Sequence, residues 1–162
     1  MIDSLRVLSL LAATLATGLM AGLYFAFSCA VMPGLASADD RTFVAAMQWI
    51  NVRILNGWFA VAFGGSFVLT TVALLLHVPP AGRGALPWVA AALVLYAATL
   101  VVTFRVNVPL NDALAAAGDP VAVADVASVR EQFEPGWVRW NAVRAVLAAG
   151  ALFALAVGLS GS

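Results

Sequence analysis

The sequence predicts an all-α integral membrane protein whose four membrane-spanning helices form one antiparallel bundle. Of its 162 residues, 64% are hydrophobic and only 10% are charged, whereas roughly a quarter of the residues in soluble domains are charged. The hydrophobic residues form four long apolar stretches, and about 20 helical residues are needed to cross a bilayer core. We expect spans at about residues 7–32, 57–77, 86–106 and 137–159, within a single domain of residues 1–162. Short connections between the spans favour antiparallel neighbours.

The charge composition excludes several kinds of partner. The formal net charge is zero and lysine is absent, so no basic patch indicates nucleic acid or a polybasic membrane anchor. We expect a multi-pass protein of the cell membrane that is surrounded by lipids and binds no nucleic acid; its oligomeric state stays open. Cys29, the single cysteine, is expected to be a buried small residue.

The first span is expected to end near Met32, because Pro33-Gly34 follows and both residues break helices. Its apolar run is much longer than the roughly 7–15 residues of a signal-peptide core, so we interpret it as a membrane helix. Small residues recur every four positions in this span, a pattern that lets a second helix approach closely. They are Thr14, Gly18, Gly22 and Ala26.

A short helix is expected before the second span. Asp39 or Asp40 can cap a helix that starts near Thr42. An unbroken helix from there to His77 would be far longer than a bilayer core. We therefore expect a bend at Asn56-Gly57, and His77 becomes an interfacial residue at the opposite end of the second span.

The third span is expected to begin at Pro87, which suits a first helical turn, and to end near Asn107. Pro109 follows, so we expect the backbone to leave the helix there and to expose its carbonyl groups.

Residues 110–134 are expected to form a partly helical polar loop before the fourth span. Asp119-Pro120 is typical of a helix start, and Pro135-Gly136 of a helix end. Arg130 and Glu134 can pair on its exposed face, where the pair contributes little. The fourth span would then begin near Trp137.

Polar residues gather at one end of the predicted bundle, which we call the mouth. Trp137, Trp140, Asn141 and Arg144 have offsets 0, 3, 4 and 7, which place them on one helix face. A buried arginine in a membrane costs about 2.5–3.5 kcal/mol on insertion scales, so Arg144 is expected to face hydrogen-bond acceptors. The side chains expected to line the mouth are Tyr24, Phe25, Phe27, Gln48, Asn51, Arg53, Asn56, Asn107, Asn111, Trp137, Trp140, Asn141 and Arg144.

The mouth allows two interpretations. It is either a pocket for a small molecule or a structural staple, meaning a polar network that only holds helix ends together. Asp112 is the acid nearest the cluster in sequence, and it is either a base, a partner of arginine or a solvated residue. No acid lies inside a span, which disfavours a proton-coupled carrier. No second histidine or cysteine lies near His77, so we expect no metal site.

Four strings, taken in order, resemble the DUF1772 or anthrone oxygenase-like family over about residues 18–150. They are Val31-Met32-Pro33-Gly34-Leu35, Met47-Gln48-Trp49-Ile50-Asn51 with Asn56, Val102-Thr103 with Asn107-Val108-Pro109-Leu110-Asn111, and W-x-x-W-N-x-x-R from Trp137 to Arg144. The resemblance implies a four-helix membrane protein. Some members of the family are linked to oxidation of anthrones to anthraquinones without a known cofactor.

The resemblance implies a role for the polar mouth. The enolate of an anthrone can react with oxygen directly, so an enzyme needs a base and donors that stabilise the enolate oxygen. Arg144, Asn141, Asn107 and Asn51 can be those donors, and Asp112 is the candidate base. We expect binding of a small apolar or aromatic molecule with cofactor-independent oxygenation. The alternative is a non-catalytic membrane subunit with a structural staple.

Overall fold

The computed structural model describes residues 2–161, except for the side chain of Ala81, and every regular element in that range is helical. The elements are α1 (Ile2–Ala26), η1 (Phe27–Val31), α2 (Met32–Ala36), α3 (Asp40–Arg53), α4 (Gly57–His77), η2 (Pro80–Gly82), α5 (Leu86–Val102), η3 (Thr103–Asn107), α6 (Val108–Ala116) and α7 (Val126–Ser160). Four helical stretches are long and apolar enough to cross a membrane, at residues 2–36, 57–77, 86–116 and 126–160. The predicted fold class is confirmed.

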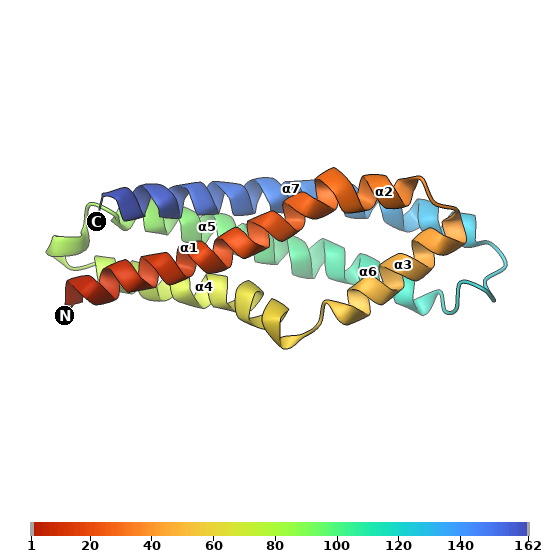
Figure 1. The fold of residues 1–162 in the computed structure, drawn as a ribbon, viewed down its shortest axis with the longest axis horizontal. Coiled ribbons are helices and arrows are strands. Elements are labelled where there is room, and N and C mark those ends of the chain that lie inside the picture. The colour runs from red at the N-terminus through yellow and green to blue at the C-terminus, as the bar shows by residue number, and fades with distance from the viewer. Residues whose placement is uncertain (1, 162) are drawn as a thin grey trace.

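The molecule is an elongated bundle in which both chain ends lie at one end and α3 lies at the other (Figure 1). The first and last spans have 35 residues each, or about 52 Å of helix at 1.5 Å per residue. A bilayer core is about 30 Å thick. Because α4 has only 21 residues, the α3 end of the bundle extends beyond the bilayer core.

Two hydrophobic cores follow one another along the bundle. The first lies among α1, α4, α5 and α7 and is centred on Leu10, Met20, Tyr96 and Leu155. In the second, α3 takes the place of α4 and packs against α2, α6 and the first half of α7. Its buried residues are Met32, Phe43, Val44, Met47, Leu114, Phe133 and Trp137.

Two proline positions that we expected to end helices lie within continuous helices. The first span continues past Pro33 to Ala36, and the third continues past Pro109 to Ala116. Each proline is preceded by one wide turn, in which the N–H of Met32 bonds to the carbonyl of Phe27, and that of Val108 to Thr103. A wide turn of this kind lets the helix continue, because it accommodates the N–H that a proline lacks and moves the earlier carbonyl away from the proline ring. The predicted carbonyl exposure near Pro109 is therefore wrong.

The last helix begins eleven residues earlier than predicted, at Val126 rather than Trp137, and contains Pro135. Phe133 and Trp137 lie on either side of this proline and are both buried in the second core. Packing on both sides compensates for the hydrogen bond that the proline cannot make. Pro135-Gly136 therefore does not end a helix.

The polar loop is consequently shorter than predicted, at residues 117–125. The carboxylate of Asp119 accepts a bond from the N–H of Val121 within a turn and does not start a helix. Asp125 provides the cap of α7 by accepting from the N–H of Ser128.

The predicted bend before the second span is confirmed. Asp39 caps α3 by accepting from the N–H of Thr42. Asn56 caps α4 by accepting from the N–H of Phe59, and its own amide donates to the carbonyl of Arg53. The end of α3 and the start of α4, on either side of this elbow (residues 54–57), are thus held by local hydrogen bonds.

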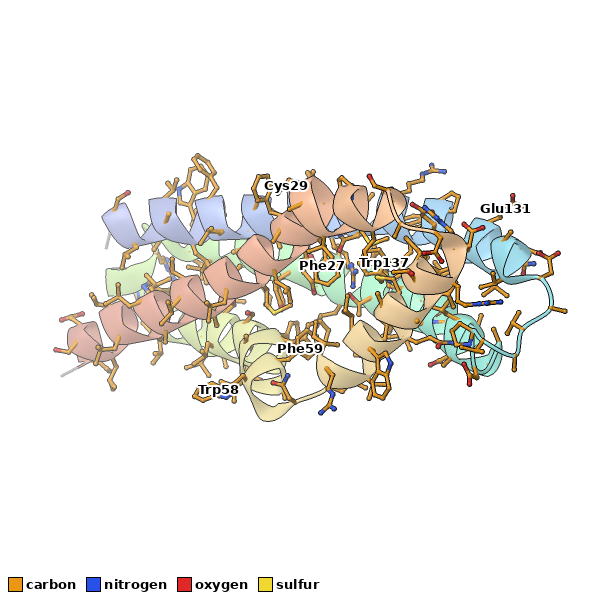
Figure 2. All side chains as sticks on the ribbon, turned by 45° about the vertical axis from the view of Figure 1, so that its right-hand side comes forward. Phe27, Cys29, Trp58, Phe59, Glu131 and Trp137 are labelled. Carbon is orange, nitrogen blue, oxygen red and sulfur yellow. The ribbon has the colours of Figure 1, made fainter. Side chains whose placement is uncertain are left out.

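Only part of the small-residue pattern in the first span faces the bundle, because Gly22 and Ala26 are exposed. An added Cβ on Gly22 would meet nothing within 4 Å, and one on Gly18 would make ordinary contact with Leu152. Cys29 and Phe25 are exposed and not buried as expected. Figure 2 shows Cys29 on the outside of the bundle and Trp58 on the outer side of the elbow, whereas Phe27 and Trp137 point inward.

His77 lies at the end of α4 away from the mouth, and its side chain is buried. Its Nδ1 lies 2.7 Å from the carbonyl oxygen of Ala73, and a carbonyl only accepts, so Nδ1 carries the proton. Nearby, buried Arg6 donates to the carbonyl of Leu76 and pairs with Asp3.

Replacing Gly82 by alanine is expected to destabilise this end of the bundle. An added Cβ would lie 2.8 Å from the Cα of His77 and 3.2 Å from the Nε of Arg6. We expect a loss of about 2 kcal/mol in the free energy of unfolding in detergent. Gly84→Ala is the control, because its Cβ would lie 3.8 Å from its nearest neighbour. Equal stability of the two variants would contradict the expectation.

Candidate functional site

A cavity of about 1240 Å³ lies at the junction of the two cores. Its wall comes from α1 and η1, from the α3–α4 elbow, from η3 and α6, and from α7. The volume exceeds the roughly 300–1,000 Å³ of typical small-molecule pockets. Exposed residues of the elbow and of α6 form its rim.

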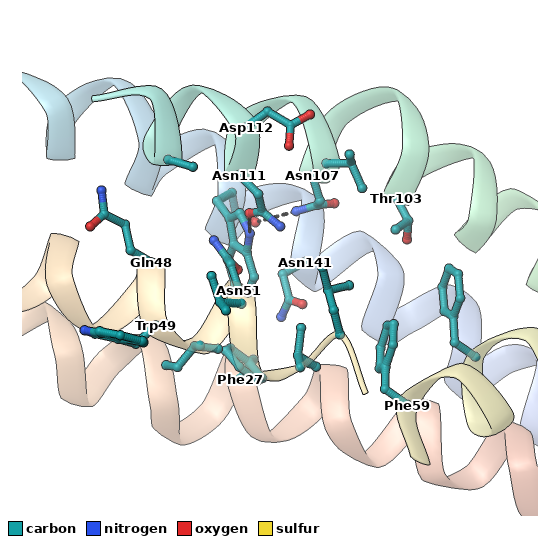
Figure 3. A pocket seen from close by; sticks show the side chains of 18 of the residues that line it. Phe27, Gln48, Trp49, Asn51, Phe59, Thr103, Asn107, Asn111, Asp112 and Asn141 are labelled. Atoms are coloured by element: carbon teal, nitrogen blue, oxygen red, sulfur yellow. Dashed lines mark hydrogen bonds between the residues drawn. The ribbon is translucent and has the colours of Figure 1, made fainter. Parts of the chain in front are cut away.

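The structure brings together most of the side chains expected to line the mouth. Asn51, Asn107, Asn111 and Asn141 point into the same space between the helices (Figure 3). The predicted residues that line the cavity are Tyr24, Phe27, Gln48, Asn51, Asn56, Asn107, Asn111, Asp112, Trp137, Asn141 and Arg144.

Three predicted residues, Arg53, Trp140 and Phe25, do not line the cavity. Arg53 is exposed and its guanidinium lies 5.9 Å from the centre of the Trp49 ring. Trp140 follows Trp137 by three positions, which turns it about 60° away from that side chain on the helix. It is half-buried beside Arg139 on the outer side.

Arg144 is the most deeply placed charge in the cavity. Its side chain donates 3.0 Å to the Oδ1 of Asn141 and 3.4 Å to the hydroxyl of Thr103. Its guanidinium carbon lies 4.6 Å from the ring centre of Tyr24 and 5.5 Å from that of Trp137. These contacts use two of the five N–H donors of a guanidinium.

No acid neutralises this guanidinium among the described residues. The three ion pairs that they form involve Arg6 and Arg130, and not Arg144. Removing a charge from water costs several kcal/mol without a charged partner, and each aromatic face returns about 0.5–2 kcal/mol. The cavity is therefore positively charged at its inner end.

Asn141 connects the first span to α7 and orients Arg144. Its amide nitrogen donates to the carbonyl of Tyr24 and to the hydroxyl of Ser28, and its oxygen accepts from Arg144. Three helical segments thus meet at one side chain. Sequence reasoning missed Ser28 and Thr103, because only the folded arrangement brings their hydroxyl groups to this pair.

Other polar lining residues make hydrogen bonds that help to hold the wall together. Gln48 donates to the carbonyls of Leu114 and Gly118, which ties α3 to the end of α6. Asn111 accepts from the indole N–H of Trp137 at 2.9 Å. These contacts, and the cap at Asn56, give the polar side chains at the sides of the cavity a structural role.

Four buried polar atoms in this cavity have no hydrogen-bond partner. Buried polar groups are almost always paired, so an unpaired group requires an explanation. Four in one cavity indicate a place where a molecule from outside can complete the hydrogen bonds. They are the hydroxyl oxygen of Tyr24, Nδ2 of Asn51, Oδ1 of Asn107 and Nε of Arg144.

Aromatic side chains line the opposite side of the cavity. Phe59 and Phe63 stack with ring centres 5.1 Å apart, and Phe63 meets Phe104 edge to face at 5.9 Å. Leu23 also lines this side. Sequence reasoning missed these residues, although the i,i+4 spacing of Phe59 and Phe63 was a usable signal.

The acids that line the cavity lie at its rim. Asp112 and Asp119 are both exposed, and Figure 3 shows Asp112 apart from the central amides. Among residues 2–161, no group of three His, Cys, Asp or Glu side chains has the arrangement of a metal site.

Comparison with known families matches residues 57–154 to the model of the anthrone oxygenase family. The matched region contains α4, α5, η3, α6 and the part of α7 that carries Arg144. No curated protein and no solved structure matches the chain. Because the family model covers more than half of the sequence, the protein belongs to the anthrone oxygenase family, also known as DUF1772.

Proposed function

We propose that this protein binds a flat aromatic ketone of the anthrone type in its cavity and catalyses cofactor-independent oxygenation of it in the cell membrane. The observation that carries the proposal is the group of four unpaired polar atoms in the cavity, one of which belongs to an uncompensated arginine. Family membership supports the same class of substrate.

The shape and polarity of the cavity suit such a molecule. Its wall is mostly apolar and includes the stacked rings of Phe59 and Phe63, which can contact the flat faces of a fused ring system. Its polar lining includes unpaired atoms of Arg144 and Asn107. A ligand can therefore place its rings against the phenylalanines and its ketone oxygen at Arg144.

The reaction needs no other oxidant or reductant. Loss of a proton from the CH₂ group opposite the ketone gives an enolate, which reacts with O₂ and takes up a proton from the solvent to form a hydroperoxide. Loss of water then leaves a second ketone. One oxygen atom ends in the product and the other in water with both hydrogens, so carbon loses four electrons and O₂ accepts four.

The residues of the inner cavity can favour the enolate. The enolate carries its negative charge on the former ketone oxygen, and fixed donors stabilise that charge in a site of low dielectric. Arg144 and Asn51 have unpaired N–H groups in the cavity. These donors act without rearrangement because tertiary contacts already hold the helices that carry them.

An oxygen electrode tests the proposal with purified protein and an anthrone. We expect uptake above the spontaneous rate, and Asn107→Ala is expected to reduce the excess by about tenfold, because a buried polar contact with the ligand is lost. Arg139→Ala is the control, since Arg139 is exposed and does not line the cavity. Uptake at the spontaneous rate in the wild type would contradict oxygenation of this substrate class.

A further inference from the structure

The inner cavity contains a cation that the protein itself does not neutralise. Arg144 is 7% exposed and takes part in none of the ion pairs of residues 2–161. The rings of Tyr24 and Trp137 attract a cation but carry no net charge. A buried charge is unfavourable until an opposite charge reaches it.

No anionic side chain faces Arg144 from the elements around it. From α1 it meets the ring of Tyr24, and from α4 the cavity wall is apolar. The groups that η3 and α7 turn toward it are Thr103, Asn107, Trp137 and Asn141, none of which is an acid. Asp112 and Asp119 are exposed rim residues, and the exposed cations Arg53 and Arg105 do not line the cavity.

The unpaired polar atoms in the cavity also favour an anionic ligand, because most of them are hydrogen-bond donors. Nε of Arg144, Nδ2 of Asn51 and the hydroxyl of Tyr24 can all donate a hydrogen bond. Only Oδ1 of Asn107 is limited to accepting. A site with one net positive charge and an excess of donors is complementary to an oxygen anion.

We propose that the cavity binds its aromatic ligand in the deprotonated form, and that the charge of this anion neutralises Arg144. The inference rests on the ligand binding proposed above and specifies the form that binds. For an anthrone, that form is the enolate; a phenolate or carboxylate on a similar flat ring system has the same chemistry. The proton leaves before the anion reaches Arg144.

Binding of the ligand as an anion explains why the inner lining has hydrogen-bond donors and a cation but no base. A base beside the reacting carbon is required only when the neutral ligand is deprotonated inside the cavity. Here the inner lining offers donors and a cation, while its carboxylates lie at the rim. The protein then stabilises an anion formed in water or at the membrane surface.

The pH dependence of binding tests the proposal without any turnover. An anthrone is titrated into the detergent-solubilised protein under argon, and binding is followed by quenching of tryptophan fluorescence. Below the pKa of the anthrone itself, the apparent affinity is expected to rise about tenfold per pH unit, and above it to level off. In Arg144→Leu this rise is expected to disappear.

Two probes of fixed charge remove the ionisation step. Anthracene-9-carboxylate is expected to bind the wild type about a hundredfold more tightly than its neutral amide. Asn141→Asp provides an internal anion, because the Oδ1 at this position lies 3.0 Å from the guanidinium of Arg144. In that variant and in Arg144→Leu the two probes are expected to bind about equally, and melting curves check that both variants fold.

The outcomes separate this inference from the proposed function. Equal affinity of the wild type for the two probes, or affinity for the anthrone that does not change with pH, would show that the neutral ligand binds and would overturn the inference. Oxygen uptake with the anthrone would still stand in that case. Failure of both probes and the anthrone to bind would overturn the proposed function and the inference together.

Discussion

Arg144→Leu is expected to weaken ligand binding and to remove oxygen uptake above the spontaneous rate while the protein still inserts and folds. The substitution removes a buried cation that has no acidic partner, so the lost hydrogen bonds are offset by a lower cost of burial. We expect the free energy of unfolding to change by less than about 1 kcal/mol. Ligand affinity should fall by about 3 kcal/mol, or roughly a hundredfold.

This result decides between a ligand site and a structural staple. If the cluster around Arg144 only holds helices together, stability and binding should fall by the same amount. Arg6→Leu is the matched control, because Arg6 is also buried but bonds to the carbonyl of Leu76 and to Asp3 at the other end of the bundle. We expect it to lose about 1 kcal/mol of stability and to retain oxygen uptake. Thermal unfolding in detergent and the oxygen electrode measure the two quantities separately.

Arg130→Ala is expected to lower the free energy of unfolding by about 3 kcal/mol. Its side chain pairs with Glu134 at 2.6 Å and Asp40 at 2.9 Å. It also donates to the carbonyls of Ala36 and Ala38 and lies 4.5 Å from the ring centre of Phe43. One side chain therefore joins the end of α2, the start of α3 and the first half of α7, and its loss removes all of these contacts together.

Arg130 and Glu134 form the predicted pair, but the pair is not on an exposed face as expected. The Arg130 side chain is only 15% exposed, and Asp40 adds a second carboxylate from a distant part of the sequence. Arg139→Ala provides the comparison, because Arg139 is exposed. Its guanidinium carbon lies 6.0 Å from the centre of the Trp140 ring, which is a weak contact. Thermal unfolding in detergent should show a change within about 0.5 kcal/mol for Arg139→Ala. A similarly small change for Arg130→Ala would show that this hub does not stabilise the fold.

Local signals were sufficient for the spans and for the elbow. Long apolar runs identify membrane helices because the bilayer core requires a fixed length of apolar helix. Asp39 and Asn56 identify helix starts because a side-chain oxygen near the first turn satisfies a free N–H. The residues of the polar mouth follow from the same spans, because successive spans run in opposite directions and so place these residues at the same end of the bundle.

Helix continuity at the three prolines could not be predicted from local signals. Pro33, Pro109 and Pro135 each remove one backbone donor, and the sequence suggests a break at each. The folded protein retains the helices because wide turns precede the first two prolines, while buried side chains flank the third. Local penalties of a few kcal/mol are overcome by packing that involves residues far away in the sequence.

The sequence alone determined that this chain is a four-span membrane protein with arginine and asparagine at one end, because hydrophobic length and helix periodicity are local properties. Only the tertiary structure decided which polar atoms are satisfied. Asn141 and Asn107 are the same residue type and both lie in the cavity, yet the amide of Asn141 is fully paired and the oxygen of Asn107 is not. That difference depends on neighbours from other helices, and it is what identifies a site for a ligand.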